Sequence, residues 1–241
     1  MSYLDHLKEL RNRLIFCFIF LIFSFGISFF FSDLITNILT YPLFDALSDR
    51  DNKRMIFTGL PEVFISYLKI SLFSAFLFSF PFFITQLSLF ISPALYKKEK
   101  NFFVPILFII PVLFYVGVLF SYYFMIPIIW DFFISFENLN NSNLFKIELE
   151  SKFNEYMKLT MYLLFSSGVA FLFPIFLLIL AKMNIINTEN LKKNRKYYFI
   201  GILIFAALFT PPDIISQLGI AIPLIIFFEL SILLIKILIK K

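Results

Sequence analysis

Six long apolar segments constrain the fold of this chain more than any other feature. An α-helix needs about 20 apolar residues to cross the roughly 30 Å hydrocarbon core of a bilayer. Most of the six segments approach or exceed that length, and Glu229 is the one charged residue within them. The pattern predicts an all-α polytopic membrane protein with six transmembrane helices, at residues 14–31, 70–91, 102–129, 159–181, 197–209 and 214–235.

The composition points to the same class of protein. Hydrophobic residues make up 60% of the chain and charged residues only 15%, whereas a soluble domain carries about 25% charged residues. We therefore expect lipid to surround most of the surface. Cys17 and His6 are the single cysteine and histidine, which argues against a disulfide framework, a metal site and most histidine-based catalysis. We expect neither an enzyme nor a bound cofactor.

The distribution of basic residues predicts the orientation. Most of the 21 Lys and Arg residues fall near the two termini or in the connections 92–101 and 182–196. The longer connections 32–69 and 130–158 carry fewer of them. By the positive-inside rule, both termini and the basic connections face the cytoplasm. We expect residues 1–241 to form a single membrane domain.

The two longer connections are predicted to lie outside. The first begins with apolar residues at helical spacing, which predicts an amphipathic helix on the outer membrane interface. These residues are Leu34, Ile35, Ile38, Leu39 and Leu43.

The last two apolar segments are joined by only four residues, Thr210 to Asp213. We expect helices five and six to be short and to thin the bilayer locally, because a hydrophobic mismatch is relieved by deforming the lipid. The alternative is that the helix ends extend into polar sequence and that lysine side chains reach the interface.

The N-terminal residues predict a short amphipathic helix that continues into the first span, because Leu4, Leu7, Leu10 and Leu14 recur at helical spacing. Glu9 and Arg13 are four residues apart on this helix and can form an ion pair. Two other residues need no functional role to account for them. We interpret His6 as a surface residue rather than a ligand, and Glu99 as balancing the charge of Lys97, Lys98 and Lys100.

Prolines within the spans would kink or interrupt their helices. Kinked spans of unequal length favour a concave, cupped wall over a tight bundle. The prolines concerned are Pro81, Pro105, Pro111, Pro174 and Pro223.

Several motifs, in order along residues 6–241, resemble the TatC subunit family of the twin-arginine protein translocase. The most specific is Phe90-Ile91-x-Pro93-Ala94-Leu95-Tyr96-x-x-Glu99. The others are His6-Leu7-x-Glu9-Leu10-Arg11-x-Arg13, Gly117-x-x-Phe120-x-Tyr122 with Pro127, Thr210-Pro211-Pro212-Asp213 with Gln217, and Ala221-Ile222-Pro223 with Glu229.

The resemblance implies a receptor for signal peptides that carry two adjacent arginines, and a cupped arrangement of the spans. Glu9 and Glu99 match the two cytoplasmic carboxylates that hold those arginines in the family. A carboxylate suits this role because it forms strong, directional hydrogen bonds with a planar guanidinium. Arg11, Phe90, Leu95 and Tyr96 are the remaining residues that the resemblance places in this peptide site.

The resemblance also implies partners and a location. The single-span subunits TatA and TatB would dock at the polar region of the last two spans, and the receptor would form an oligomer. We expect no nucleic acid partner. The location would be the bacterial inner membrane or, alternatively, an organellar inner membrane of bacterial descent. Docking or structural roles are expected for Pro42, Tyr122, Thr210, Asp213, Gln217 and Glu229.

The sequence departs from the family pattern at two places. Many family members carry a glutamate where Leu172 stands, so an acidic contact within the membrane is in doubt. Thr85 and Ser88 replace an aromatic pair around Gln86. Neither change affects Glu9 or Glu99.

Two other functions remain as alternatives. A small secondary transporter would favour inverted repeats and a polar site at the middle of the membrane, but no repeat is visible and Glu229 has no basic partner within the spans. A membrane-embedded hydrolase would need a constellation of catalytic side chains at depth, which the sequence lacks.

Overall fold

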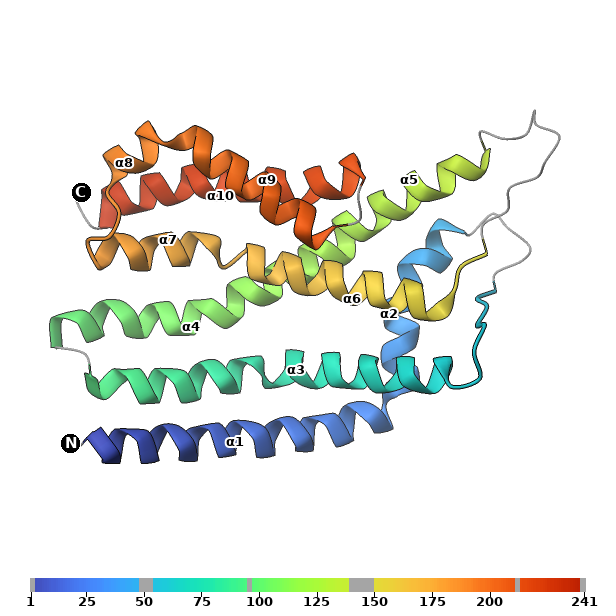
Figure 1. The fold of residues 1–241 in the computed structure, drawn as a ribbon, viewed down its shortest axis with the longest axis horizontal. Helices are drawn as coiled ribbons and strands as arrows, with labels where there is room; N and C mark the ends of the chain where they lie inside the picture. Colours follow the sequence, from blue (N-terminus) through green and yellow to red (C-terminus); the bar gives the residue numbers. More distant parts are fainter. Residues whose placement is uncertain (1–2, 48–53, 95–96, 139–149, 211–212, 239–241) are drawn as a thin grey trace. The chain divides into compact units, whose positions relative to one another are not determined.

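A computed structural model describes residues 3–47, 54–94, 97–138, 150–210 and 213–238 (Figure 1). Apart from short turns and one isolated bridge, these residues are helical, which confirms the predicted all-α class. Five helical stretches of the described chain are long and apolar enough to cross a membrane. They are Asp5–Phe30, Glu62–Ile91, Phe102–Ser135, Phe153–Lys182 and Ile214–Ile237.

The described residues fall into two compact units. One unit draws its described residues from 1–41, 54–112 and 151–161, and the other draws them from 42–53, 113–150 and 162–241. The predicted cupped arrangement and the single domain stay predictions.

In the first unit, α1 (Tyr3–Phe30) packs against α3 (Glu62–Ile91). Helix α1 runs without interruption through the N-terminal leucines into the first span, as predicted. Both helices bury small side chains, which allow helices to approach closely in a membrane. The rings of Phe20 on α1 and Phe82 on α3 also stack, with centroids 4.4 Å apart. The buried small residues are Ser24 and Ser28 on α1 and Ser71, Ser74, Ala75 and Ser79 on α3.

The amphipathic segment predicted after the first span is helical, as α2 (Ser32–Ala46). Leu39 and Leu43 are buried, whereas Leu34 and Ile38 are exposed. The helix therefore has one buried and one exposed apolar face, and its predicted location on the outer membrane interface stays a prediction.

Hydrogen bonds in the first unit tie together segments that are distant in sequence. Ile56 and Lys152 form the isolated bridge, and the Phe153 N–H donates to the Ile56 carbonyl at 3.0 Å. The Tyr156 hydroxyl donates to the Leu39 carbonyl at 2.7 Å. These bonds attach the start of α6 to α2 and to the segment before α3.

Helix α3 ends in a short 3-10 turn, Ser92–Ala94, and α4 (Lys97–Phe120) follows. A π-helical turn, Ser121–Met125, joins α4 to α5 (Ile126–Asn138). The third predicted span thus continues for about two turns beyond its predicted end at residue 129.

The fourth predicted span is broken into α6 (Phe153–Ala170) and α7 (Phe173–Lys182). Leu172 lies at the break, and Pro174 occupies the first turn of α7. Proline fits there because the first turn of a helix leaves backbone N–H groups without a helical acceptor. The expectation that Pro174 interrupts its span is confirmed.

In the second unit, α4 and α6 meet at two glycines. A Cβ atom added to Gly117 would lie 2.6 Å from the Ser167 carbonyl oxygen, and one added to Gly168 would lie 2.6 Å from the Phe114 ring. The Ser167 hydroxyl donates to the Gly117 carbonyl at 2.9 Å. The close approach of these helices therefore requires glycine at both positions.

The chain ends with α8 (Thr188–Lys193), α9 (Arg195–Phe209) and α10 (Ile214–Leu238). Helix α9 has 15 residues, about 22 Å at the usual rise, which confirms a short fifth helix. The prediction of a short sixth helix is wrong: α10 has 25 residues, about 37 Å. The tight connection before α10 fixes where the helix begins, but not how far it continues. Because α9 falls short of a full span, the count of six spans stays a prediction.

Candidate functional site

The N-terminal half of α1 and the C-terminal half of α3 line an open cavity of about 610 Å³, and most of its lining residues are polar or charged. Glu9 lies in this cavity, and its side chain is about one fifth exposed. Phe16 and Phe82 provide aromatic walls. Asp5, Lys8, Asn12, Arg13 and Gln86 complete the lining.

Arg13 fixes the carboxylate of Glu9 and joins the two helices. Its Nε donates to Glu9 Oε1 at 3.0 Å, so the predicted i,i+4 ion pair forms. Its Nη1 donates to Gln86 Oε1 and its Nη2 to the Leu89 carbonyl, both at 3.3 Å. The guanidinium therefore binds one residue of α1 and two of α3.

The two carboxylate oxygens of Glu9 have different environments. Arg13 binds Oε1, whereas Oε2 is buried and accepts no hydrogen bond from the residues that the structure describes. A buried carboxylate oxygen without a donor is unfavourable, because burial removes its hydration. A second guanidinium at Oε2 would relieve this cost.

His6 of α1 and Phe90 of α3 do not line this cavity, but they contact each other. Their rings stack with centroids 4.3 Å apart and an interplanar angle of 17°. The stack explains His6 as a packing residue and gives Phe90 a fixed position on α3. Arg11 is exposed and donates to Asn12 Oδ1 at 3.3 Å, so it lies outside the Glu9 ion pair.

Gln86 is a site residue that the sequence motifs did not mark as functional. It lines the cavity and holds Arg13 by a hydrogen bond between residues 73 positions apart. Its signal in the sequence is weak: it is a lone amide in the apolar stretch 70–91. Polar side chains within a span usually face protein or water, and this rule would have selected it.

The remaining predicted peptide-site residues are not placed together with Glu9. Leu95 and Tyr96 lie outside the described residues. Glu99 belongs to the first turn of α4, and its side chain is not described. Their roles stay predictions.

The predicted docking residues between α9 and α10 form local helix-end contacts. The Thr210 hydroxyl donates to the Ala206 carbonyl at 3.0 Å. Asp213 Oδ2 accepts the Ser216 N–H at 2.7 Å, which caps α10. Gln217 Nε2 donates to the Leu203 carbonyl at 3.1 Å and so ties α10 to α9.

Glu229 has a basic partner that the sequence did not predict. Arg195 Nη2 donates to Glu229 Oε2 at 2.7 Å, and both side chains are nearly half exposed. No partner was expected within the spans, but Arg195 lies just before the fifth apolar segment, as the first residue of α9. The ion pair joins the start of α9 to the C-terminal half of α10.

The other two predicted structural residues lie on separate elements. Pro42 is buried within α2. Tyr122 lies in the π-helical turn, and its ring packs edge-on against Tyr123 with centroids 5.0 Å apart.

The chain is similar to one family of known proteins. Residues 5–223 match the family model described as "Sec-independent protein translocase protein (TatC)". The chain is 39% identical to a protein of that name from Rickettsia prowazekii over 96% of this chain and 91% of that one. It is 37% identical to one from Desulforapulum autotrophicum, over 95% and 82% of the two chains.

A solved structure has a similar fold. The crystal structure of a twin-arginine translocase receptor, TatC, aligns with a TM-score of 0.78 and 32% sequence identity. The alignment covers 96% of this chain and 98% of that chain.

Proposed function

Because the chain belongs to the TatC family of Sec-independent protein translocase proteins, we propose that it is the membrane receptor for twin-arginine signal peptides. As a member of that family it is a multi-pass membrane subunit of a protein translocase, a transport protein rather than a member of an enzyme family. The receptor role supposes that one arginine of the peptide binds Glu9.

The observation that carries the proposal is the environment of Glu9. The carboxylate of Glu9 lies in an open cavity of about 610 Å³, with one oxygen held by Arg13 and the other buried without a donor from the described chain. An arginine side chain can supply charge-assisted hydrogen bonds to the second oxygen. Lysine presents a compact ammonium instead of a planar fork, so it fits such an acceptor less well.

Glu99 is proposed as the second acceptor. Two adjacent arginines carry two guanidinium groups, and a pair of carboxylates can bind one each. Phe90, Leu95 and Tyr96 would contact the peptide beside these charges, and Arg11 would border the site.

We propose the partners and the orientation on the same basis. The polar contacts of Thr210, Asp213 and Gln217 lie at the connection between α9 and α10, where single-span TatA and TatB subunits would dock. Hydrogen bonds between membrane helices contribute about 1 kcal/mol each, enough to favour a partner at a polar site. The chain would assemble as an oligomer in the bacterial inner membrane, with both termini in the cytoplasm.

The test is binding of a twin-arginine signal peptide to the purified full chain, with a twin-lysine peptide as the comparison. We expect Glu9→Gln or Glu99→Gln to weaken binding about 10- to 100-fold, as for loss of a hydrogen bond between charged groups. Glu155→Gln is the matched control, because Glu155 is an exposed carboxylate at the start of α6 and should leave the affinity unchanged.

Equal binding of the two peptides by the wild-type chain would overturn the receptor proposal. A clear preference for twin arginine that persists in both glutamine variants would instead overturn the assignment of the two carboxylates.

A further inference from the structure

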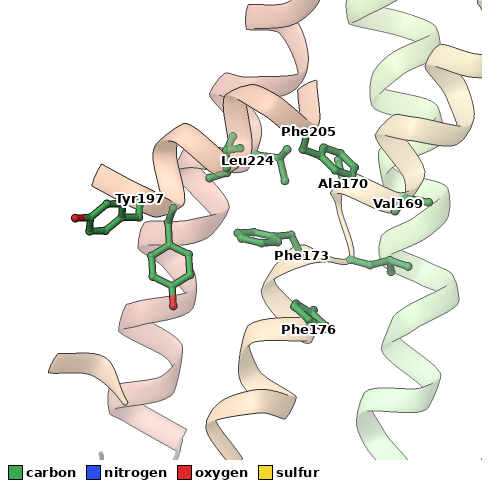
Figure 2. A pocket seen from close by; sticks show the side chains of 11 residues that line it. Val169, Ala170, Phe173, Phe176, Tyr197, Phe205 and Leu224 are labelled. Carbon is green, nitrogen blue, oxygen red and sulfur yellow. The ribbon is translucent and has the colours of Figure 1, made fainter. Parts of the chain in front are cut away.

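An apolar cavity of about 490 Å³ lies in the second unit, whereas the polar site at Glu9 belongs to the first (Figure 2). Phe173 and Phe176 of α7 form one side, and Phe205 of α9 lies on another (Figure 2). Leu172, at the break between α6 and α7, also lines it, so the position where the family pattern often has glutamate is apolar here. The volume falls within the roughly 300–1,000 Å³ of ordinary ligand pockets.

Gly201 leaves this cavity open on the α9 side. It lines the cavity, and a Cβ atom built on it would meet no heavy atom within 4 Å. Glycines 117 and 168 differ, because their added Cβ atoms would collide with neighbouring groups. The glycine at 201 is therefore not required for helix packing, and a larger side chain there would occupy the cavity.

Basic residues lie close in sequence to Tyr197, which lines the cavity. Lys196 Nζ lies 5.1 Å from the centroid of the Tyr197 ring. Lys192 and Lys193 occupy the last turn of α8 and are exposed. Arg195 is engaged by Glu229, so the three lysines provide the positive charge.

We propose that this cavity binds an anionic phospholipid, with an acyl chain among the phenylalanines and the phosphate at Lys192, Lys193 and Lys196. An uncharged apolar lining suits a hydrocarbon chain, because burying a polar group there without a hydrogen bond is costly. Basic clusters next to transmembrane helices attract anionic headgroups. Tyrosines such as Tyr197 and Tyr198 are typical of the level where headgroups meet hydrocarbon.

The charge distinguishes this occupant from others. A zwitterionic lipid would fill the cavity but would gain little from the three lysines. A free phosphate would meet the lysines but would leave the apolar cavity empty. An apolar helix of a partner subunit would cover the cavity without any preference for a lipid headgroup.

The test is native mass spectrometry of the purified full chain with equal amounts of phosphatidylglycerol and phosphatidylethanolamine. We expect preferential binding of phosphatidylglycerol. Each of Lys192→Gln, Lys193→Gln and Lys196→Gln should weaken it about fivefold, the equivalent of about 1 kcal/mol per basic residue near an anionic surface. Lys236→Gln, in the last turn of α10, is the matched control.

A second variant tests the acyl site. Gly201→Leu should reduce phosphatidylglycerol binding at least tenfold, because the new side chain enters the cavity. Gly26→Leu is its control, since a Cβ at Gly26 also meets nothing within 4 Å and Gly26 lines no part of this cavity. Circular dichroism would verify that both variants stay folded.

Two results would overturn the proposal. One is equal binding of both lipids by the wild-type chain. The other is wild-type phosphatidylglycerol binding by a folded Gly201→Leu variant, which would indicate that another occupant, such as a partner helix, covers the cavity.

Discussion

At the residue scale, Arg13 orients Glu9 and links the two helices of the candidate site. It holds one oxygen of Glu9 and reaches across to Gln86 and to the Leu89 carbonyl. A peptide arginine would therefore meet a carboxylate that Arg13 has already oriented. Preorganisation of this kind reduces the entropy lost on binding.

Replacing Arg13 should loosen this contact between α1 and α3. We expect Arg13→Gln to lower the free energy of unfolding by about 1.5–3 kcal/mol, because it removes hydrogen bonds to a charged group and leaves Glu9 without its partner. Thermal or denaturant unfolding in detergent would measure the change. Arg11→Gln is the control, since Arg11 is exposed and contacts its neighbour Asn12. Equal losses in the two variants would refute this role of Arg13.

The sequence could predict only part of this site. The pairing of Glu9 with Arg13 follows from helical spacing, which is local information. The contact of Arg13 with Gln86 could not be predicted in the same way, because it depends on which helix lies beside α1 and in which register. The rule that polar residues within spans face protein or water selects Gln86, but not its partner.

At the element scale, both units have small residues on their packed helices. The spacing of Ser71, Ala75 and Ser79 on α3 follows the small-xxx-small pattern of membrane helix contacts. This pattern is visible in the sequence, but by itself it does not identify the helix that packs against α3. In the second unit, Gly117 and Gly168 provide the corresponding close approach.

We expect Gly117→Ala to destabilise the chain by about 1–3 kcal/mol, the range for overpacking a tight contact. The new methyl group would collide with the backbone oxygen of Ser167, which cannot move aside as a side chain could. The free energy of unfolding in detergent is the measurement. In the control Gly26→Ala, the methyl group meets open space, and a gain of up to about 1 kcal/mol is expected from helix propensity. A loss of the same size in both variants would contradict the steric explanation.

The lengths of helices could be predicted less well than their existence. Apolar stretches identified the helices because lipid exposure requires apolar side chains. Pro174 predicted an interruption of the fourth span, and the helix does break beside it, at Leu172. The prediction that α10 is short was wrong. That length depends on where polar residues stop helix formation, and Lys236 does not stop it, since a lysine can extend its charge to the interface.

At the scale of the whole molecule, the predicted orientation rests on the distribution of basic residues and can be tested directly. The single Cys17 can be replaced by serine to give a background without cysteine. In that background we expect Glu155→Cys, at the start of α6, to react with a membrane-impermeant maleimide in intact cells. Asn190→Cys, in α8, should react only after the membrane is made permeable. Both positions are exposed in the structure. The reverse labelling pattern would invert the predicted topology.

The short α9 has an electrical consequence. A bilayer that adjusts its hydrocarbon thickness to this helix thins from about 30 Å to about 22 Å. The energy of moving one charge across the full membrane potential, about 2.3 kcal/mol per 100 mV, does not depend on thickness. The electric field does depend on thickness, because in a thinner bilayer the same voltage falls over a shorter distance. Beside α9 the field would be stronger by about a third, so charged and dipolar groups there would respond more to the membrane voltage than those beside the longer helices.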